Sequence, residues 1–198
     1  MHQIKLGIFL FLFLQNSLSG KTFEWKEYSA SKEQNLLIIE IVNSLESNHF
    51  IKKKYIDIKD EASKLYIERL DPNKTIFLLE ELNQFKKEEG KSTQITHGLQ
   101  QAFLVFKTYR ERYIARYNFQ LNVLNNLSED DLQSQRAILR DRTDTVYLKS
   151  LSELEILWKS LIINDVIQLR LSNNSLEESK VKIMKRLNNQ FNYFNQTD

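Results

Sequence analysis

Three pairs of neighbouring glutamates are the side chains in this 198-residue sequence best suited to acid–base chemistry. The pairs are Glu80/Glu81, Glu88/Glu89 and Glu177/Glu178. Two carboxylates that act on one substrate must face it together, whereas consecutive residues of an α-helix point about 100° apart. We therefore interpret these pairs as solvent-exposed helix faces and not as catalytic dyads.

Metal and thiol chemistry have little support in the sequence. The chain contains no cysteine, which excludes disulfides and thiolate ligands. Its histidines are His2, His49 and His97, and none has a second ligand at the spacing of a helical metal site. We expect no metal site and no cofactor site, and we interpret His49 and His97 as ordinary capping or surface residues.

Serine nucleophiles are also disfavoured, although serines and lysines are plentiful enough to suggest pairs by eye. A nucleophilic serine needs a tight turn and oxyanion donors, which are usually built with glycine. Glycine occurs only at positions 7, 20, 90 and 98, and there is no G-x-S-x-G motif. We therefore predict no catalytic residue in this chain.

The stretch FLVFKTYRERYIARYNF (103–119) is the strongest candidate for nucleic-acid binding, because aromatic and basic side chains together can hold single strands. Its aromatic residues follow one helical face, with the arginines beside them, which is typical of a buried stripe with a solvated flank. The formal net charge of the whole chain is only +2. We predict core packing here and no nucleic-acid partner, and we interpret the lysines at 52–54 as a solvated linker.

The elements that must position these side chains are predicted to be helices. Few glycines, a single proline and many Leu, Ile, Lys, Glu and Gln residues favour an all-α domain of about five to six helices. One of them is long and central. The predicted helices span residues 31–48, 58–70, the segment up to 89, 93–127, 152–171 and 176–194.

Apolar residues at helical spacing predict the buried face of each helix. A capping box is predicted at Ser31 and Gln34, and a helix C-cap at Gly90. The predicted inner residues of the first two helices and of the last are Leu37, Ile38, Ile41, Val42 and Leu45; Ala62, Leu65, Tyr66 and Leu70; and Val181, Met184, Leu187, Phe191 and Phe194. Those of the long helix and the one after it are Leu99, Ala102, Phe103, Phe106, Tyr109, Tyr113, Tyr117, Leu121 and Leu124; and Leu154, Leu157, Trp158 and Leu161.

Pro72, the only proline, predicts a corner between two helices. Proline fixes φ and disfavours the helical conformation of the residue before it, so the preceding helix should end at Leu70. Asp71 and Pro72 suit the first two positions of a type I turn. The chain should reverse here and deliver residues 76–78 into the core.

The N-terminus has the pattern of a secretory signal. A short polar start is followed by nine apolar residues (6–14) and by small residues at Ser17 and Ser19. Nine helical residues are too short to span a bilayer. We expect a signal peptide over residues 1–19 that is cleaved near Ser19–Gly20, a mature domain over 20–198, and no stable membrane span.

Several motifs in order resemble the N-terminal helical region of tail-specific proteases, the carboxy-terminal processing peptidases of the Prc type. They are Leu70-Asp71-Pro72 with Phe77-Leu78 and Phe85; the Arg/Tyr-rich block 110–127; Glu153, Leu154, Leu157 and Trp158 in an E-L-x-x-L-W arrangement within 138–171; and the end 185–198. The similarity covers about residues 28–198. One departure is Glu80-Glu81, where the family commonly has Ser-Asp.

The resemblance implies the non-catalytic domain of a periplasmic serine protease that processes proteins from their C-termini. In that family a PDZ domain engages the substrate and a Ser–Lys dyad cleaves it, and both lie downstream of the region matched here. The resemblance therefore supplies no catalytic residue, and it implies that this chain is inactive alone. The expected partners are the PDZ and protease core, an adaptor or a substrate protein.

Two alternatives stay open from the sequence. The chain could be a fragment or truncated product of such a protease, with the apolar face of its last helix uncovered, or a standalone exported helical binding module. A weaker alternative is a protein of the membrane surface that uses its basic linker and amphipathic helices.

Overall fold

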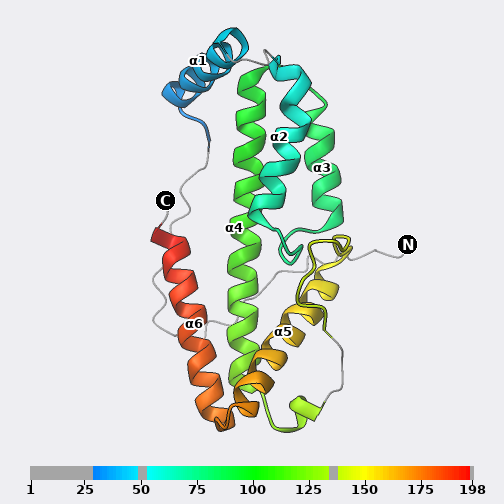
Figure 1. The fold of residues 1–198 in the computed structure, drawn as a ribbon, viewed down its shortest axis with the longest axis vertical. Helices are drawn as coiled ribbons and strands as arrows, with labels where there is room; N and C mark the ends of the chain where they lie inside the picture. The colour runs from blue at the N-terminus through cyan, green and yellow to red at the C-terminus, as the bar shows by residue number, and fades with distance from the viewer. Residues whose placement is uncertain (1–28, 49–52, 134–137, 197–198) are drawn as a thin grey trace, which may run out of the picture.

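The computed structural model describes residues 29–48, 53–133 and 138–196, which form six α-helices and one short 3-10 helix (Figure 1). The elements are α1 (Lys32–Asn48), α2 (Tyr55–Leu70), α3 (Leu79–Glu89), α4 (Ile95–Asn126), η1 (Asp130–Gln133), α5 (Leu151–Leu171) and α6 (Leu176–Gln196). Within these ranges the only strand-like pairing is an isolated parallel bridge between Leu78 and Leu148. The prediction of an all-α domain with one long central helix is confirmed.

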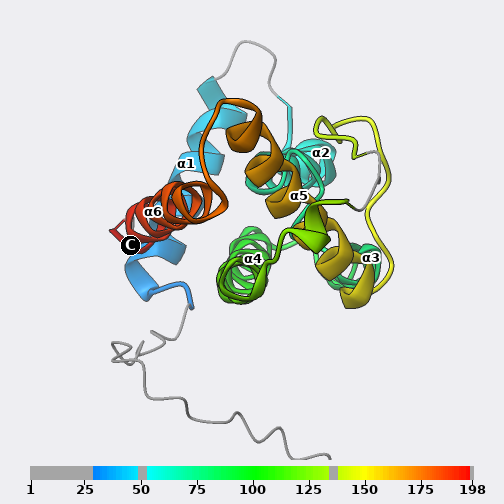
Figure 2. The ribbon, with the colours of Figure 1, turned by 90° about the horizontal axis from the view of Figure 1, so that it is seen from below.

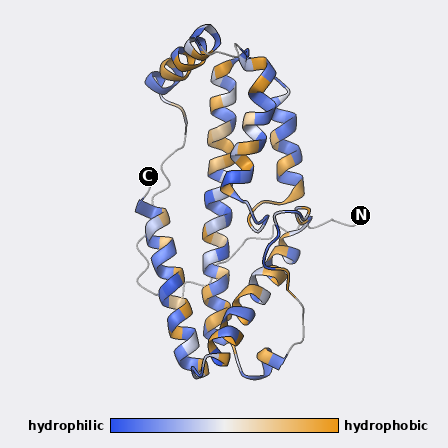
Figure 3. Cartoon of the chain, in the orientation of Figure 1, coloured by the Kyte–Doolittle hydropathy of each residue, from blue (hydrophilic) through white to orange (hydrophobic). Residues whose placement is uncertain are grey.

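The long helix α4 is the axis of the fold, and every other α-helix contacts it. Helices α2 and α3 lie along its first half, whereas α5 and α6 flank its second half (Figure 1). Figure 2 looks along this axis and shows α6 on one side of α4 and α3 on the other, with α2 and α5 between these two. Figure 3 shows apolar and polar residues alternating along the helices, which is the pattern of amphipathic helices.

The core consists of three clusters along this axis. The largest lies where α4, α5 and α6 meet, and its buried members are Leu124, Leu127, Ile162, Ile163, Val166, Ile183 and Leu187. A second cluster, Phe77, Phe85 and Val105, lies between α2, α3 and α4. Leu78, Leu154 and Trp158 form the third, which joins the segment before α3 to α5.

Most predicted helix ends are confirmed, because the capping chemistry is local. The Ser31 and Gln34 side chains exchange hydrogen bonds with each other's backbone N–H groups, at 3.2 and 2.8 Å. Gly90 is the C-cap of α3. Helix α2 begins at Tyr55, three residues before the prediction, because Glu46 of α1 accepts the Tyr55 N–H at 2.6 Å.

Several predicted inner faces are wrong. On α2, Ala62 and Leu65 are exposed, and Ile67 joins the core with Tyr66 and Leu70. On α6, Val181 is 65% exposed, whereas Ile183 is buried. Periodicity finds an amphipathic stripe, but the edge of the stripe that meets a neighbour depends on how the helices pack.

Helix α1 shows the same limit more strongly, because none of its residues is fully buried. Ile38 and Val42 of the predicted face are half-buried, while Leu37, Ile41 and Leu45 are exposed by 55%, 44% and 48%. The neighbouring Leu36 is exposed as well. Helix α1 thus contacts α4 and leaves part of its apolar surface open.

The aromatic stripe of α4 packs in the core region, as predicted, and its partner is α6. Tyr117 stacks on Phe191 with ring centroids 4.0 Å apart, and Tyr113 stacks on Phe194 at 4.2 Å. These contacts cover much of the apolar face of α6, so the expectation that this face is left uncovered is wrong for Leu187, Phe191 and Phe194 and holds for Val181. The apolar side chains that α6 still exposes include Val181, at one end of the predicted face, and Tyr193.

The prediction that Arg110 lies on the solvated flank of α4 is wrong. The side chain is 1% exposed, and its guanidinium lies over the rings of Phe106 and Phe194, at 6.0 and 5.0 Å from their centroids. Cation–π attraction favours such a placement for a partly desolvated arginine. Arg110 is therefore part of the contact between α4 and α6.

Candidate functional site

Asp71 anchors the corner between α2 and α3. Helix α2 ends at Leu70, as predicted, and the Lys74 N–H donates to the Asp71 carbonyl at 3.2 Å, which closes the turn. The Asp71 side chain is almost fully buried, and its carboxylate accepts three backbone N–H groups, from Thr75 (2.8 Å), Ile76 (2.9 Å) and Phe77 (3.0 Å). A buried carboxylate is stable only when it is hydrogen-bonded in this way.

Thr75 connects this corner to two other helices. The indole Nε1–H of Trp158 on α5 donates to the Thr75 carbonyl at 2.7 Å. Arg116 on α4 donates from Nη1 to the Thr75 hydroxyl at 2.9 Å. One residue of the corner therefore fixes two side chains that are far away in the sequence.

Glu81 starts helix α3. One of its oxygens, Oε2, accepts the Leu78 N–H at 2.8 Å, and the other, Oε1, accepts from both Nε and Nη2 of Arg112 at 3.0 and 2.8 Å. Glu81 thus caps the start of the helix through its side chain. It also ties α3 to α4.

The glutamate pairs contribute in the same structural way. Glu80 is exposed while Glu81 is half-buried, so the two do not face one substrate. Glu178 caps α6, because it accepts the Ser175 N–H at 2.7 Å while the Ser175 hydroxyl accepts the Glu178 N–H. The prediction of exposed helix faces is confirmed for Glu80, Glu177 and Glu178, whereas Glu81, Glu88 and Glu89 are half-buried.

The histidines are not brought together with other ligands in the ranges described. His97 is half-buried near the start of α4, and no group of three His, Asp or Glu side chains within those ranges could hold a metal ion. His2, His49, Lys52 and the predicted signal peptide (1–19) lie outside the described residues. No helix in the described ranges is long and apolar enough to cross a membrane.

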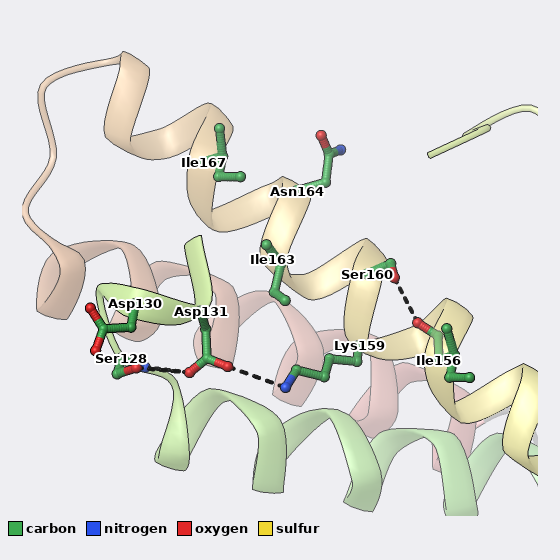
Figure 4. Close-up of a pocket in the computed structure, with 9 residues that line it drawn as sticks. All are labelled: Ser128, Asp130, Asp131, Ile156, Lys159, Ser160, Ile163, Asn164 and Ile167. Carbon is green, nitrogen blue, oxygen red and sulfur yellow. Dashed lines mark hydrogen bonds and ion pairs between the residues drawn. The ribbon is translucent and has the colours of Figure 1, made fainter. Parts of the chain in front are cut away.

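A first cavity, of about 440 Å³, lies between η1 and α5 (Figure 4). The Asp131 carboxylate at its mouth accepts the N–H and hydroxyl of Ser128, at 3.0 and 2.9 Å, and pairs with Lys159 at 3.2 Å. These hydrogen bonds, those from Ser128 foremost, lower the pKa of Asp131. Ile163 and Ile167 form the apolar wall. Because Asp131 caps the 3-10 helix η1 and pairs with Lys159, we interpret its carboxylate as structural.

A second cavity, of about 650 Å³, is lined by α4, α5, α6 and Arg140. We call it the arginine–tyrosine cavity. Its charged residues are Arg116, Arg140, Arg186 and Asp165, and its aromatic residues are Tyr109, Tyr113, Tyr117, Tyr193 and Phe194. Burial lowers the pKa of Arg116 and raises the pKa of Tyr109 to about 12. This cavity combines positive charge with an apolar aromatic wall.

The arginine–tyrosine cavity is suited to binding an anionic or aromatic ligand. The described residues do not show a nucleophile with an oriented base. The sequence missed the roles of Asp71, Thr75 and Arg116. The Leu-Asp-Pro motif could have suggested the first, because aspartate often accepts backbone N–H groups just after a turn. Nothing local could have linked Thr75 to Trp158, 83 positions later.

Comparison with known proteins agrees with this structure. Residues 41–198 match the family described as "Tail specific protease N-terminal domain". The chain belongs to this family. It is also 28% identical, over 162 residues, to the "Tail-specific protease" of Haemophilus influenzae. That match covers 80% of this chain and 23% of the relative, so the chain spans about a quarter of the length of that protein.

As a tail-specific protease N-terminal domain, the chain places its family motifs at defined points of the fold. Leu-Asp-Pro forms the α2–α3 corner, and the E-L-x-x-L-W segment begins α5. Trp158 of the second motif donates to Thr75, just after the first. Leu78 of the first motif also shares a core cluster with Leu154 and Trp158 of the second, so these two motifs touch each other in the core.

Proposed function

We propose that this chain is the non-catalytic helical N-terminal part of an exported, periplasmic tail-specific serine protease. The observation that carries the proposal is the match of residues 41–198 to the N-terminal domain of that family. The Haemophilus influenzae relative is about four times as long as the matched segment. We assign cleavage to the other parts of such a protein. The signal-like pattern over residues 1–19 supports export.

The physical role of the domain in this proposal is docking and scaffolding. Leu36, Leu37, Ile41 and Leu45 of α1 leave an apolar strip exposed, and apolar strips of this kind are usually covered by a partner. We assign this strip to the remainder of the protease, because the matched relative contains far more chain than this domain. An adaptor or substrate protein would use the other surfaces.

A chimera tests this proposal. The chain replaces the corresponding segment of the Haemophilus influenzae protease, and cleavage of an unstructured protein is followed by gel electrophoresis. We expect the chimera to cleave and the isolated chain to be inactive. Cleavage by the highly purified isolated chain would refute the non-catalytic role, and an inactive but folded chimera would refute the scaffolding role.

A matched pair of substitutions tests the α1 strip in the same chimera. Leu37→Asp places a charge on the apolar strip, whereas Asn43→Asp places the same charge at an exposed polar position of α1. We expect at least a tenfold loss of cleavage for Leu37→Asp only. Equal activity of the two variants would show that the strip does not contact the rest of the protease.

A further inference from the structure

We propose that the arginine–tyrosine cavity binds a peptide carboxylate that is flanked by an apolar side chain. The peptide class rests on the proposed function, in which this domain belongs to a protease. The cavity itself is argued from charge, burial and shape. Its volume of about 650 Å³ lies within the range of ordinary ligand sites.

Positive charge exceeds negative charge in this cavity. Three arginines and one aspartate line it, which leaves an excess of two positive charges. Asp165 lies between two of the arginines and pairs with Arg140 through one oxygen and with Arg186 through the other. The one internal carboxylate is therefore shared, and it does not neutralise the site.

Arg116 is the group that points most directly to an anionic ligand. It comes from the middle of α4, and its single hydrogen bond among the described residues goes to the neutral hydroxyl of Thr75. Among the described residues it makes no close ion pair, and the Asp71 and Asp165 carboxylates act on it only at longer range. A mostly buried guanidinium has five N–H donors, and a carboxylate is the ligand that best matches its geometry.

The aromatic wall supplies the second half of the recognition. Tyr113 and Phe194 stack at 4.2 Å, and Tyr117 stacks on Phe191 at 4.0 Å, so α4 and α6 hold these rings in fixed positions. The Tyr117 hydroxyl donates to Asn188 at 2.7 Å, which fixes it further. Rigid aromatic side chains bind apolar groups at little entropic cost.

The cavity is lined by residues of α4, α5 and α6, three helices that contact one another and lie side by side in Figure 2. The site therefore depends on the packing of all three helices. It is also separate from the first cavity, which lies between η1 and α5 (Figure 4). A ligand here would contact the mostly buried Arg116 and the exposed Tyr193.

Fluorescence anisotropy of the full chain tests the proposal with two labelled octapeptides. Both consist of serine and glycine and end in leucine and phenylalanine; one has a free C-terminal carboxylate and the other a C-terminal amide. We expect the acid to bind at least about tenfold more tightly, because the amide cannot form charge-assisted hydrogen bonds with arginine. Equal binding of the two peptides, or no binding of either, would overturn the proposal.

Three variants locate the site. Arg116→Gln should weaken binding of the acid about tenfold and abolish its advantage over the amide, whereas Asp165→Asn should strengthen binding severalfold by removing the competing carboxylate. Arg69→Gln, an exposed arginine on α2 outside the cavity, is the control for net charge and should change nothing. Circular dichroism confirms that each variant is folded.

The gain expected for Asp165→Asn cannot come from misfolding, so it keeps the test decisive if Arg116→Gln is unstable. Weaker binding by Asp165→Asn, or the same loss in Arg69→Gln as in Arg116→Gln, would overturn the assignment to this cavity. A third peptide, an amide with aspartate near its end, tests whether the C-terminus is required: if it binds like the acid, a side-chain carboxylate serves as well as a C-terminal one, and if it binds like the amide, only the C-terminal carboxylate is recognised. Failure of peptide binding in an active chimera would reject this inference alone.

Discussion

Among substitutions that neutralise one charged side chain at the α2–α3 corner, Asp71→Asn should destabilise the domain most. The Asp71 carboxylate is 2% exposed and accepts three backbone N–H groups at 2.8–3.0 Å. The substituted amide side chain would have only one acceptor oxygen. If that oxygen replaced Oδ2, it would keep the bonds to Ile76 and Phe77, and its NH₂ group would face the Thr75 N–H.

The size of the effect follows from these three bonds. Leaving one buried N–H without an acceptor costs about 1–3 kcal/mol, and each of the other two loses about 1 kcal/mol when a charged acceptor becomes neutral. Burying a neutral amide costs less than burying a carboxylate, which offsets part of the loss. We expect the free energy of unfolding to fall by about 3 kcal/mol, a large fraction of the total for a typical domain.

Urea unfolding followed by far-UV circular dichroism measures this loss, with an unchanged m-value as the check that the same structure unfolds. Asp144→Asn is the matched control, because Asp144 is exposed in the connection before α5, and it should change stability by less than about 0.5 kcal/mol. A loss below about 1 kcal/mol for Asp71→Asn, similar to the control, would refute the anchoring role of the carboxylate.

Two further predictions concern the aromatic residues of α4 and α6. Phe191→Ala should lower the free energy of unfolding by about 2–3 kcal/mol and speed amide exchange in α6, because Phe191 stacks on Tyr117; Tyr193→Ala, at a 71% exposed position, should have little effect in the same exchange experiment. The pKa of Tyr109 is about 12 in the folded chain, mainly through burial, against about 10 when unfolded, so its contribution to stability is complete below pH 10 and lost between pH 10 and 12. Stability measured across that range should fall less steeply in Tyr109→Phe, and an identical slope would contradict this.

The sequence predicted the helices well because their signals are local. Caps such as Ser31 and Gln34 are three residues apart, and the 3.6-residue period of apolar side chains is complete within each helix. Pro72 placed the α2–α3 corner for the same reason, since its effect on φ and on the preceding residue needs no partner. The all-α class follows from these elements together.

Which face of each helix is buried, and the burial of Arg110, could not be predicted from the sequence with the same success. Arg110 is buried because Phe194, from the last helix, lies against its guanidinium, and no local pattern around Arg110 contains that information. Leu37 and Ile41 have the period of a buried face, yet they are exposed because α4 covers only one side of α1. Periodicity describes one helix, whereas burial depends on its neighbours.

The corner and the arginine–tyrosine cavity are physically linked through Thr75. Asp71 fixes the Thr75 backbone, the Thr75 hydroxyl accepts from Arg116, and Arg116 lines the cavity. Trp158 holds the same residue from α5 through the Thr75 carbonyl. Because each of these groups is buried or half-buried, a shift of the corner would reorient the guanidinium in the cavity. The motif that defines the α2–α3 corner thereby also positions the group that we propose binds a carboxylate, although it takes part in no chemistry itself.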